Sequence, residues 1–333
     1  MSAPFLEVNN LKTYFPVEGR AFLRRDRGIV RAVDNVSFSL AQGEALGLVG
    51  ESGCGKSTLG RTILQLIPPT AGSVVLAGRH LEELRGRELR EARADFQMIF
   101  QDPYASLNPR MSVFDALAEA IRSHRRVPRR ELPGRVSLLM TMVGLLPAAR
   151  NKYPHEFSGG QRQRIAIARA LAVEPKLVIA DEPVSALDVS IQAQIINLLA
   201  KIRRELGLAL IFISHDLSVV RHIADRIAVM YLGKIVELGP PDALMKKPLH
   251  PYTKALLSAV PIADPKREGQ RRRVVLGGDP PSPLAPPIGC PFHLRCPYGI
   301  PACTEAVPPL KEWQPGHYAA CIRVPEIEEK DEE

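Results

Sequence analysis

The sequence predicts an α/β protein whose core is a mostly parallel sheet, preceded by an antiparallel β region and followed by a small cysteine-rich extension. Three observations support this fold class. A glycine-rich loop lies between a short apolar segment and a helical one, apolar segments then alternate with helical ones from residue 177 to 238, and the composition changes after residue 260. Such alternation is typical of parallel sheets with right-handed crossovers.

The first 45 residues are predicted to be mainly antiparallel strands. Residues 5 to 45 alternate between apolar and polar side chains, as half-buried strands do. The arginine-rich insertion from Arg20 to Arg31 interrupts them and is interpreted as an extended hairpin or loop. The run from Ala45 to Val49 is short, apolar and bounded by glycines, which favours a buried parallel strand.

The glycine-rich loop has the spacing of a phosphate-binding loop, G-x-x-x-x-G-K-S/T, and leads into a predicted helix from Ser57 to Leu66. Glycines let backbone N–H groups face phosphates, and the helix N-terminus adds the positive end of its dipole. Lys56 is expected to hold the β- and γ-phosphates, and the Ser57 hydroxyl to ligate Mg²⁺. A glycine-rich turn without a ligand is the alternative. The loop residues are Gly50, Glu51, Ser52, Gly53, Cys54, Gly55, Lys56, Ser57 and Thr58, of which Cys54 is interpreted as a small filler.

Residues 80 to 155 are rich in Leu, Ala, Glu and Arg and are predicted to be mainly helical, although the apolar stretch Met98 to Phe100 precedes Gln101 within them. The next helix is predicted to begin near Gln161, with Ser158 as its N-cap. Its N-terminus would then present backbone amides to an anion. A capped surface helix without a ligand is the alternative. The segment at this helix start is Phe157, Ser158, Gly159, Gly160 and Gln161.

An acidic pair, Asp181 and Glu182, follows the apolar strand Leu177 to Ala180. Ligand-contacting groups lie at the carboxyl ends of strands in open α/β sheets, so Asp181 is expected to reach a Mg²⁺ ion. Alternation along an extended segment would turn Glu182 away from Asp181 and toward an attacking water, as a general base. The alternative is an acidic pair that merely caps a buried strand.

The remaining core elements are predicted from the same periodicity. They are a helix over 189–205, a strand over 209–214 that ends before His215, a helix over 216–224, and strands over 226–230 and 234–238. This α/β part is expected to end near residue 260.

Beyond residue 260, the proline-rich stretch Pro280 to Pro287 is interpreted as a stiff, extended linker. Cys290, Cys296, Cys303 and Cys321 follow it, and clustered cysteines in a cytosolic chain favour a metal site over disulfides. Their spacing lacks the C-x2-C pairs usual in zinc ribbons. His293 and His317 lie close enough in the sequence to be alternative ligands. Both are expected instead to be surface residues whose hydrogen bonds are satisfied. Glu326 to Glu333 is expected to be a solvated acidic tail.

Composition limits the possible classes of protein. The hydrophobic content of 45% is ordinary for a globular protein, and no apolar stretch approaches the ~18 residues of a membrane span. The N-terminus lacks a signal-peptide pattern, which predicts a cytosolic protein. The net charge of +8 comes from arginine clusters without interleaved stacking aromatics, so no nucleic-acid partner is predicted.

Taken together, the phosphate loop, the Phe157–Gln161 segment and the Asp181-Glu182 pair resemble the ATP-binding cassette (ABC) ATPases. The resemblance implies that residues 158–161 are the signature motif, which faces the γ-phosphate of ATP held by a second subunit. It also implies a Q-loop glutamine that senses Mg²⁺ and attacking water, a D-loop at the dimer interface, a switch histidine at the γ-phosphate and an aromatic residue that stacks on adenine. These are Gln101, Asp188 within Ser185–Asp188, His215, and Phe15 with Tyr14 as its alternative.

Segments outside the nucleotide motifs look like the ATPase subunits of dipeptide and oligopeptide importers. They are Asp102 to Pro109, His250 to Leu257 and the G-C-P-F-H-x-R-C-P run that contains Cys290 and Cys296. Some of these subunits hold a 4Fe-4S cluster at such cysteines, and four thiolates suit that cluster, with structural Zn²⁺ or free cysteines as alternatives. The implied domains are a nucleotide-binding domain at 1–260, with a helical subdomain at about 80–170, and a C-terminal extension at 261–333.

The implied assembly sits on the cytoplasmic face of the membrane. Its other members are two transmembrane permease subunits, a second ABC ATPase that is expected to be a paralogue, and an extracytoplasmic peptide-binding protein. A related importer of nickel, glutathione or another solute is an alternative. So are a soluble ABC ATPase acting on nucleic acid or ribosomes, and a redox-sensing protein centred on its cluster.

Overall fold

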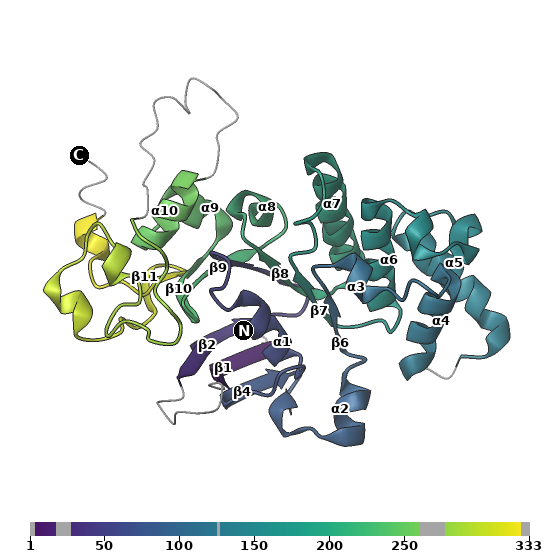
Figure 1. Cartoon of the computed structure of the whole chain (residues 1–333), viewed down its shortest axis with the longest axis horizontal. Helices are drawn as coiled ribbons and strands as arrows, with labels where there is room; N and C mark the ends of the chain where they lie inside the picture. Colours follow the sequence, from purple (N-terminus) through teal and green to yellow (C-terminus); the bar gives the residue numbers. More distant parts are fainter. Residues whose placement is uncertain (1–3, 18–27, 125–126, 260–276, 328–333) are drawn as a thin grey trace, which may run out of the picture.

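The computed structural model describes residues 4–17, 28–124, 127–259 and 277–327. An eight-stranded sheet runs through the centre, with a four-stranded sheet beside it (Figure 1). A helical region and the cysteine-bearing extension lie at opposite ends of the long axis. The described part of the chain contains no helix with the length and apolarity of a membrane span.

The central sheet has the order β11-β12-β10-β9-β3-β8-β7-β6. Its strands from β9 to β6 are parallel, whereas β10, β12 and β11 are antiparallel to their neighbours. The bounds are β3 (Ala45–Val49), β6 (Phe96–Ile99), β7 (Leu177–Asp181), β8 (Ala209–Ser214), β9 (Arg226–Tyr231), β10 (Lys234–Gly239), β11 (Lys311–Gln314) and β12 (His317–Ala319).

Both faces of the parallel strands are buried, which explains why β3 and all but the last residue of β7 and of β8 are apolar. Successive side chains of a strand point to opposite faces, so Leu210 and Phe212 join one hydrophobic core while Ile211 and Ile213 join the other. The second core also contains α1 (Lys56–Ile63) and the smaller sheet. This sheet is antiparallel, as the sequence predicts, and comprises β1 (Leu6–Pro16), β2 (Ile29–Leu40), β4 (Ala71–Leu76) and β5 (Arg79–His80).

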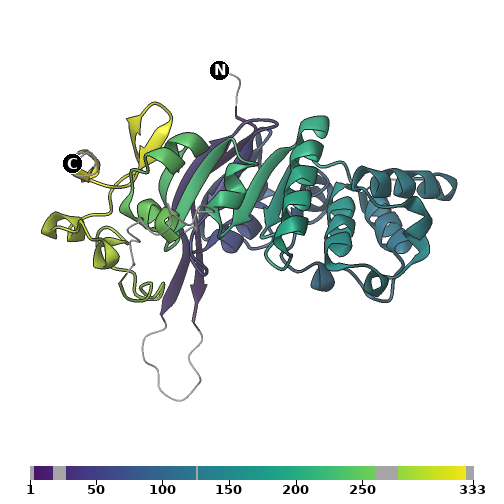
Figure 2. The same ribbon diagram turned by 90° about the horizontal axis from the view of Figure 1, so that it is seen from above.

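The helices cover the faces and one end of the central sheet (Figures 1 and 2). Four of them, α3 to α6, form the helical region. The bounds are α2 (Gly86–Ala92), α3 (Pro103–Ser106), α4 (Val113–His124), α5 (Leu132–Met142), α6 (Gly159–Leu171), α7 (Val189–Leu206), α8 (Leu217–Arg221), α9 (Pro241–Lys246) and α10 (Pro251–Ala259). Short 3-10 turns lie at Leu81–Glu83, Arg129–Glu131, Pro147–Asn151, Pro154–Glu156, His293–Arg295 and Pro301–Thr304.

The predicted α/β fold class is confirmed, and the elements from β7 to β10 begin at the predicted residues apart from α8, which starts one residue later and is shorter. The helix after the phosphate loop starts one residue earlier and ends at Ile63 instead of Leu66. Most of the Arg20–Arg31 insertion, residues 20–27, lies outside the described residues, while Ile29, Val30 and Arg31 belong to β2.

The extension is joined to the central sheet by the β11–β12 hairpin, which the sequence analysis did not predict. Its strand β12 pairs with β10, where Leu238 lies opposite Tyr318. The expected surface position of His317 is wrong, because its side chain is 1% exposed. The cause is Glu237 on β10, whose carboxylate accepts hydrogen bonds from the His317 ring at 2.8 Å and from the backbone N–H groups of Leu249 and His250.

Glu237→Ala should lower the free energy of unfolding by ~3–5 kcal/mol, because it leaves His317 and two buried N–H groups without their acceptor. Denaturant unfolding, monitored by circular dichroism, measures this free energy. Glu312→Ala is the matched control. Glu312 is an exposed glutamate of the same hairpin, and the one hydrogen bond resolved for its side chain is accepted from the Gly316 N–H. Equal stability losses in the two variants would contradict the role of Glu237.

Candidate active site

The phosphate loop joins the end of β3 to the start of α1, as its strand-loop-helix context predicts. Gly55 has a φ of 106°, and a Cβ there would lie 2.0 Å from the Ala32 carbonyl oxygen, so only glycine fits. No side chain caps α1. The first amides of this helix are therefore left to an anionic ligand.

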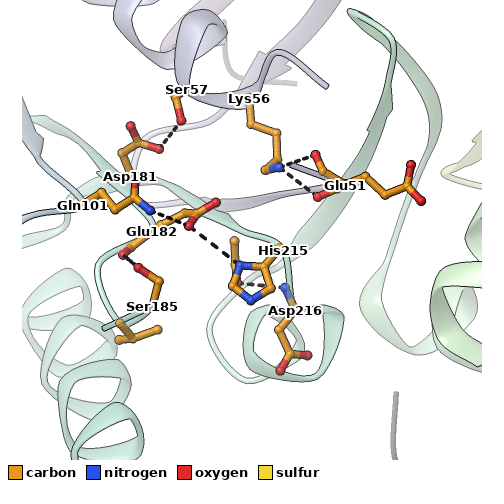
Figure 3. Close-up of polar contacts among 12 residues, drawn as sticks. Glu51, Lys56, Ser57, Gln101, Asp181, Glu182, Ser185, His215 and Asp216 are labelled. Atoms are coloured by element: carbon orange, nitrogen blue, oxygen red, sulfur yellow. Dashed lines mark hydrogen bonds and ion pairs between the residues drawn. The ribbon is translucent and has the colours of Figure 1, made fainter. Parts of the chain in front are cut away.

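Lys56 lies under the loop and is buried at 4% exposure. Its ammonium group donates to the backbone carbonyls of Gly50 at 2.8 Å and Glu51 at 2.9 Å (Figure 3). Both acceptors are neutral, so the positive charge stays available to phosphate oxygens.

Ser57 and Asp181 meet at the carboxyl end of β7. The Ser57 hydroxyl donates to Asp181 Oδ1 at 2.7 Å, while Asp181 Oδ2 is buried, accepts no hydrogen bond and lies 3.8 Å from the Arg61 guanidinium. Burial raises the pKa of Asp181, although the Ser57 hydrogen bond opposes the shift. A carboxylate beside a hydroxyl is a suitable donor set for Mg²⁺, which prefers oxygen ligands.

Glu182 lies between two of the predicted site residues (Figure 3). Its Oε2 accepts from Gln101 Nε2 at 3.0 Å and lies 3.7 Å from His215 Nδ1. Alternation along an extended segment, the basis of the prediction for Glu182, does not apply here. Glu182 adopts a left-handed conformation with a φ of 44°, and this turn directs its side chain.

The signature segment stands apart from this group. Ser158 caps α6 by accepting from Gln161 N–H at 3.3 Å, and the Gln161 side chain accepts in return from Ser158 N–H, which confirms the predicted cap. Asp188 caps α7 by accepting from Ile191 N–H at 2.9 Å. In the described structure, none of Ser158, Gly159, Gly160, Gln161 and Asp188 lines the cavity that contains the phosphate loop, Gln101 and Glu182.

The same cavity has walls that the sequence analysis missed. They are Val30, Arg31 and Ala32 of β2, Leu232 and Gly233 after β9, and Pro283 of the proline-rich stretch. Arg31 N–H donates to the Pro283 carbonyl at 3.2 Å. No spacing or periodicity signals this contact, because it joins segments far apart in the sequence.

The structure separates the two aromatic candidates for adenine stacking. The Tyr14 hydroxyl donates to Asp34 at 2.6 Å, and burial together with this hydrogen bond raises the pKa of Tyr14 to about 12. Phe15 is 37% exposed and does not itself line the cavity, although its strand partner Val30 does. This geometry favours Phe15.

Phe15→Ala should weaken MgATP binding by roughly 2- to 10-fold, since an aromatic stack contributes ~0.5–1.5 kcal/mol. Tyr14→Phe is the control and should leave the affinity unchanged. Titration with a fluorescent ATP analogue measures both. A larger loss in Tyr14→Phe than in Phe15→Ala would contradict the assignment.

The four cysteines of the extension line one common cavity, although up to 31 residues separate them. Cys290 and Cys303 are buried, and Cys296 and Cys321 are partly buried. Burial and the neighbouring cysteines raise the pKa of Cys290 and of Cys321 to about 11. Within the described ranges, three potential ligand atoms lie within 4.8 Å of one another only at His80, Glu82 and Glu83, so the cysteine sulfurs are spread more widely than that.

Comparison with known proteins identifies the family. A profile described as "ABC transporter" matches residues 33–185, and one described as "Oligopeptide/dipeptide transporter, C-terminal region" matches residues 236–303. The oligopeptide transport ATP-binding protein AppF of Bacillus subtilis is 53% identical over 317 residues, covering 95% of this chain and 96% of AppF. The chain belongs to the ABC transporter ATP-binding proteins. OppF of Salmonella typhimurium, another oligopeptide transport ATP-binding protein, is 53% identical over 96% of each chain.

Solved ABC cassettes share the fold. A dimeric ATP-binding cassette in a post-hydrolysis state with ADP and Pi matches with a TM-score of 0.63 and 29% identity, over 71% of this chain and 98% of that one. The protein cbiO1 of Clostridium perfringens, part of the ABC transporter complex cbiONQ, also has a TM-score of 0.63, with 27% identity over 74% and 93% of the two chains. This ABC ATPase therefore hydrolyses ATP in the service of transport.

Proposed function

We propose that this ABC ATPase energises the import of di- or oligopeptides by binding and hydrolysing MgATP between two cassettes. The main support is the composition of the cavity. It is lined by the phosphate loop, Gln101 and Glu182, whereas the signature segment does not line it. The names of the relatives and the match to an oligopeptide/dipeptide transporter region support the peptide class. Nickel, glutathione and other solutes are the alternatives within the same transporter type.

In the proposed mechanism, Lys56 and the loop amides bind the phosphates, while Ser57 and Asp181, with Gln101, hold Mg²⁺. Mg²⁺ supplies charge neutralisation of the β- and γ-phosphoryl oxygens when it is bound. Glu182 accepts hydrogen bonds from the attacking water and polarises it, and His215 contributes positive charge or a donor near the γ-phosphate. Ser158 and the following residues of a second cassette complete the site.

A groove beside Gln101 is the proposed docking site for a permease. Residues of β6, α4 and α6 line it, including Glu119 and Arg169, together with Phe100 directly after β6. Phe100 is 40% exposed and directly precedes Gln101, so a partner in the groove would contact the segment that holds Glu182. We place the chain on the cytoplasmic face of the membrane, with two permeases, a paralogous second cassette and an extracytoplasmic peptide-binding protein. The cassette then spans 1–260 and the extension 261–333.

Affinity capture from detergent-solubilised membranes tests this assembly. The tagged chain should retain two multispanning permease chains and a second cassette, and the purified complex should hydrolyse ATP faster when the peptide-loaded binding protein is added. Phe100→Asp should abolish the capture, whereas Leu146→Asp, at an apolar site that is 78% exposed on the same helical region, should preserve it. Capture of a ribosome or nucleic acid in place of permeases would contradict the proposal.

We also propose that Cys290, Cys296, Cys303 and Cys321 hold a 4Fe-4S cluster. All four line one cavity, and four thiolates are the usual ligand set of such a cluster. A single Zn²⁺ with Zn–S bonds of ~2.3 Å requires sulfur atoms about 3.8 Å apart. Within the described residues no three of these sulfurs lie within 4.8 Å of one another, so metal analysis decides between the two groups.

Anaerobic purification followed by metal and acid-labile sulfide analysis tests the cluster. We expect about four iron and four sulfide per chain. Cys303→Ser should lose both, while Cys54→Ser, which changes the one cysteine outside the extension, should retain them. One zinc per chain without sulfide would contradict the cluster and indicate structural Zn²⁺. Metal-free protein would contradict both metal groups and indicate free cysteines.

A further inference from the structure

A charged pair connects the cysteine-bearing extension to the phosphate loop. The Arg295 guanidinium donates to both carboxylate oxygens of Glu51, at 2.9 and 3.2 Å, although the two residues are 244 positions apart. The Arg295 side chain is 7% exposed and that of Glu51 is 27% exposed. A bidentate, largely buried pair of this kind fixes the geometry as well as the charge.

Glu51 is held at three points. Its side chain is bound by Arg295, its backbone N–H donates to the Tyr252 hydroxyl at 2.8 Å, and its carbonyl accepts from Lys56 Nζ at 2.9 Å. Figure 3 shows the Glu51 carboxylate directed away from Lys56, so the side chain does not neutralise the lysine. The peptide that orients Lys56 is therefore itself oriented from the extension.

The segment that carries Arg295 is anchored next to the same loop. Phe292 is 1% exposed and packs edge-on against Tyr231 and at a tilt against Tyr252, with centroid distances of 5.3 and 5.4 Å. Both Phe292 and Arg295 lie between Cys290 and Cys296, so they occupy a short stretch whose two ends face the cysteine cavity.

We propose that Arg295 is a positioning residue of the ATP site: by holding Glu51 it keeps the phosphate loop and Lys56 in the geometry that binds the phosphates. A metal group bound to Cys290 and Cys296 would fix the positions of both cysteines, and therefore also the position of Arg295 between them. Filling of the cysteine cavity and binding of MgATP therefore favour each other, since coupling between two sites is reciprocal. This second step rests on the proposed metal-binding function of the cysteines, whereas the first does not.

A double-mutant cycle on the full chain tests the positioning role, with the Kd for a fluorescent ATP analogue and Mg²⁺ as the readout. We expect Arg295→Ala and Glu51→Gln each to raise the Kd about 10-fold, which corresponds to 1.4 kcal/mol. The double variant should be no weaker than either single variant, because both remove one interaction. In the assembled transporter, Arg295→Ala should raise the KM for ATP and leave kcat within about two-fold.

Controls separate this role from a general loosening of the extension. Lys311→Ala removes a positive charge from the same extension, where Lys311 lies over the Trp313 ring, and should leave the Kd within about two-fold. Arg295→Lys keeps the charge without the bidentate fork and should raise the Kd by about three-fold. Thermal unfolding checks that each variant folds, and Glu51→Gln carries the test if Arg295→Ala does not. An unchanged Kd, or effects of the two substitutions that multiply, would overturn the proposal.

Substitution of one of the four cysteines tests the coupling. Cys290→Ser should raise the Kd for MgATP in the wild-type background but have no further effect in the Arg295→Ala background. If the purified chain contains no metal, the cluster proposal fails while the Arg295–Glu51 cycle still stands. If the chain contains metal and Cys290→Ser changes the Kd equally in both backgrounds, the coupling does not pass through Arg295 and is overturned.

Discussion

Glu182→Gln should reduce ATP turnover of the assembled transporter by about 10²- to 10⁴-fold while MgATP binding is retained. The glutamine has the same size and keeps a hydrogen-bonding partner for Gln101, which donates to Glu182 at 3.0 Å. It lacks the basicity that polarises the attacking water. Phosphate release measures turnover, and equilibrium titration with a fluorescent ATP analogue measures binding.

Asp216→Asn is the matched control for Glu182→Gln. Asp216 is a neighbouring carboxylate whose Oδ1 accepts from Ser218 as the cap of α8. Asparagine caps helices as well as aspartate does, so this variant should hydrolyse ATP at close to the wild-type rate. Near-normal turnover in Glu182→Gln would contradict its assignment as the general base.

Lys56→Ala should weaken MgATP binding by roughly 10- to 100-fold, because a hydrogen bond to a charged group contributes ~1.5–3 kcal/mol. The buried ammonium is the charge that the loop presents to the phosphates, and the acceptors resolved for it, the carbonyls of Gly50 and Glu51 and the Cys54 sulfur, all belong to the loop itself. Lys201→Ala removes the same charge from α7, where it pairs only with Glu205 among the resolved ion pairs, and should bind MgATP normally. Unchanged affinity in Lys56→Ala would count against its role.

Much of the core could be predicted from the sequence because its signals are local. Apolar runs of four or five residues predict β3, β7 and β8, since strands covered on both faces are mostly apolar. The N-cap at Ser158 was also local, because capping depends on a side chain and an amide three residues apart. The site residues at strand ends follow from the same parallel topology.

The remainder depends on contacts between distant segments. The left-handed conformation of Glu182 has no signature in its residue type, and the Pro283 wall and the Arg295–Glu51 pair join segments that no periodicity relates. The sequence predicts a surface position for His317, because nothing near it in the chain indicates the buried Glu237 to which it is hydrogen-bonded. Each of these features depends on tertiary structure, which overrides local preference.

We infer that the ATP site is shared between two cassettes, because the signature segment does not line the cavity that the described residues form around the phosphate loop. Sedimentation velocity of the Glu182→Gln chain, alone and mixed with each paralogous cassette of its source, tests this directly. With saturating MgATP we expect a dimer, which Ser158→Phe should prevent. A chain that stays monomeric with MgATP and every candidate partner present would contradict the account.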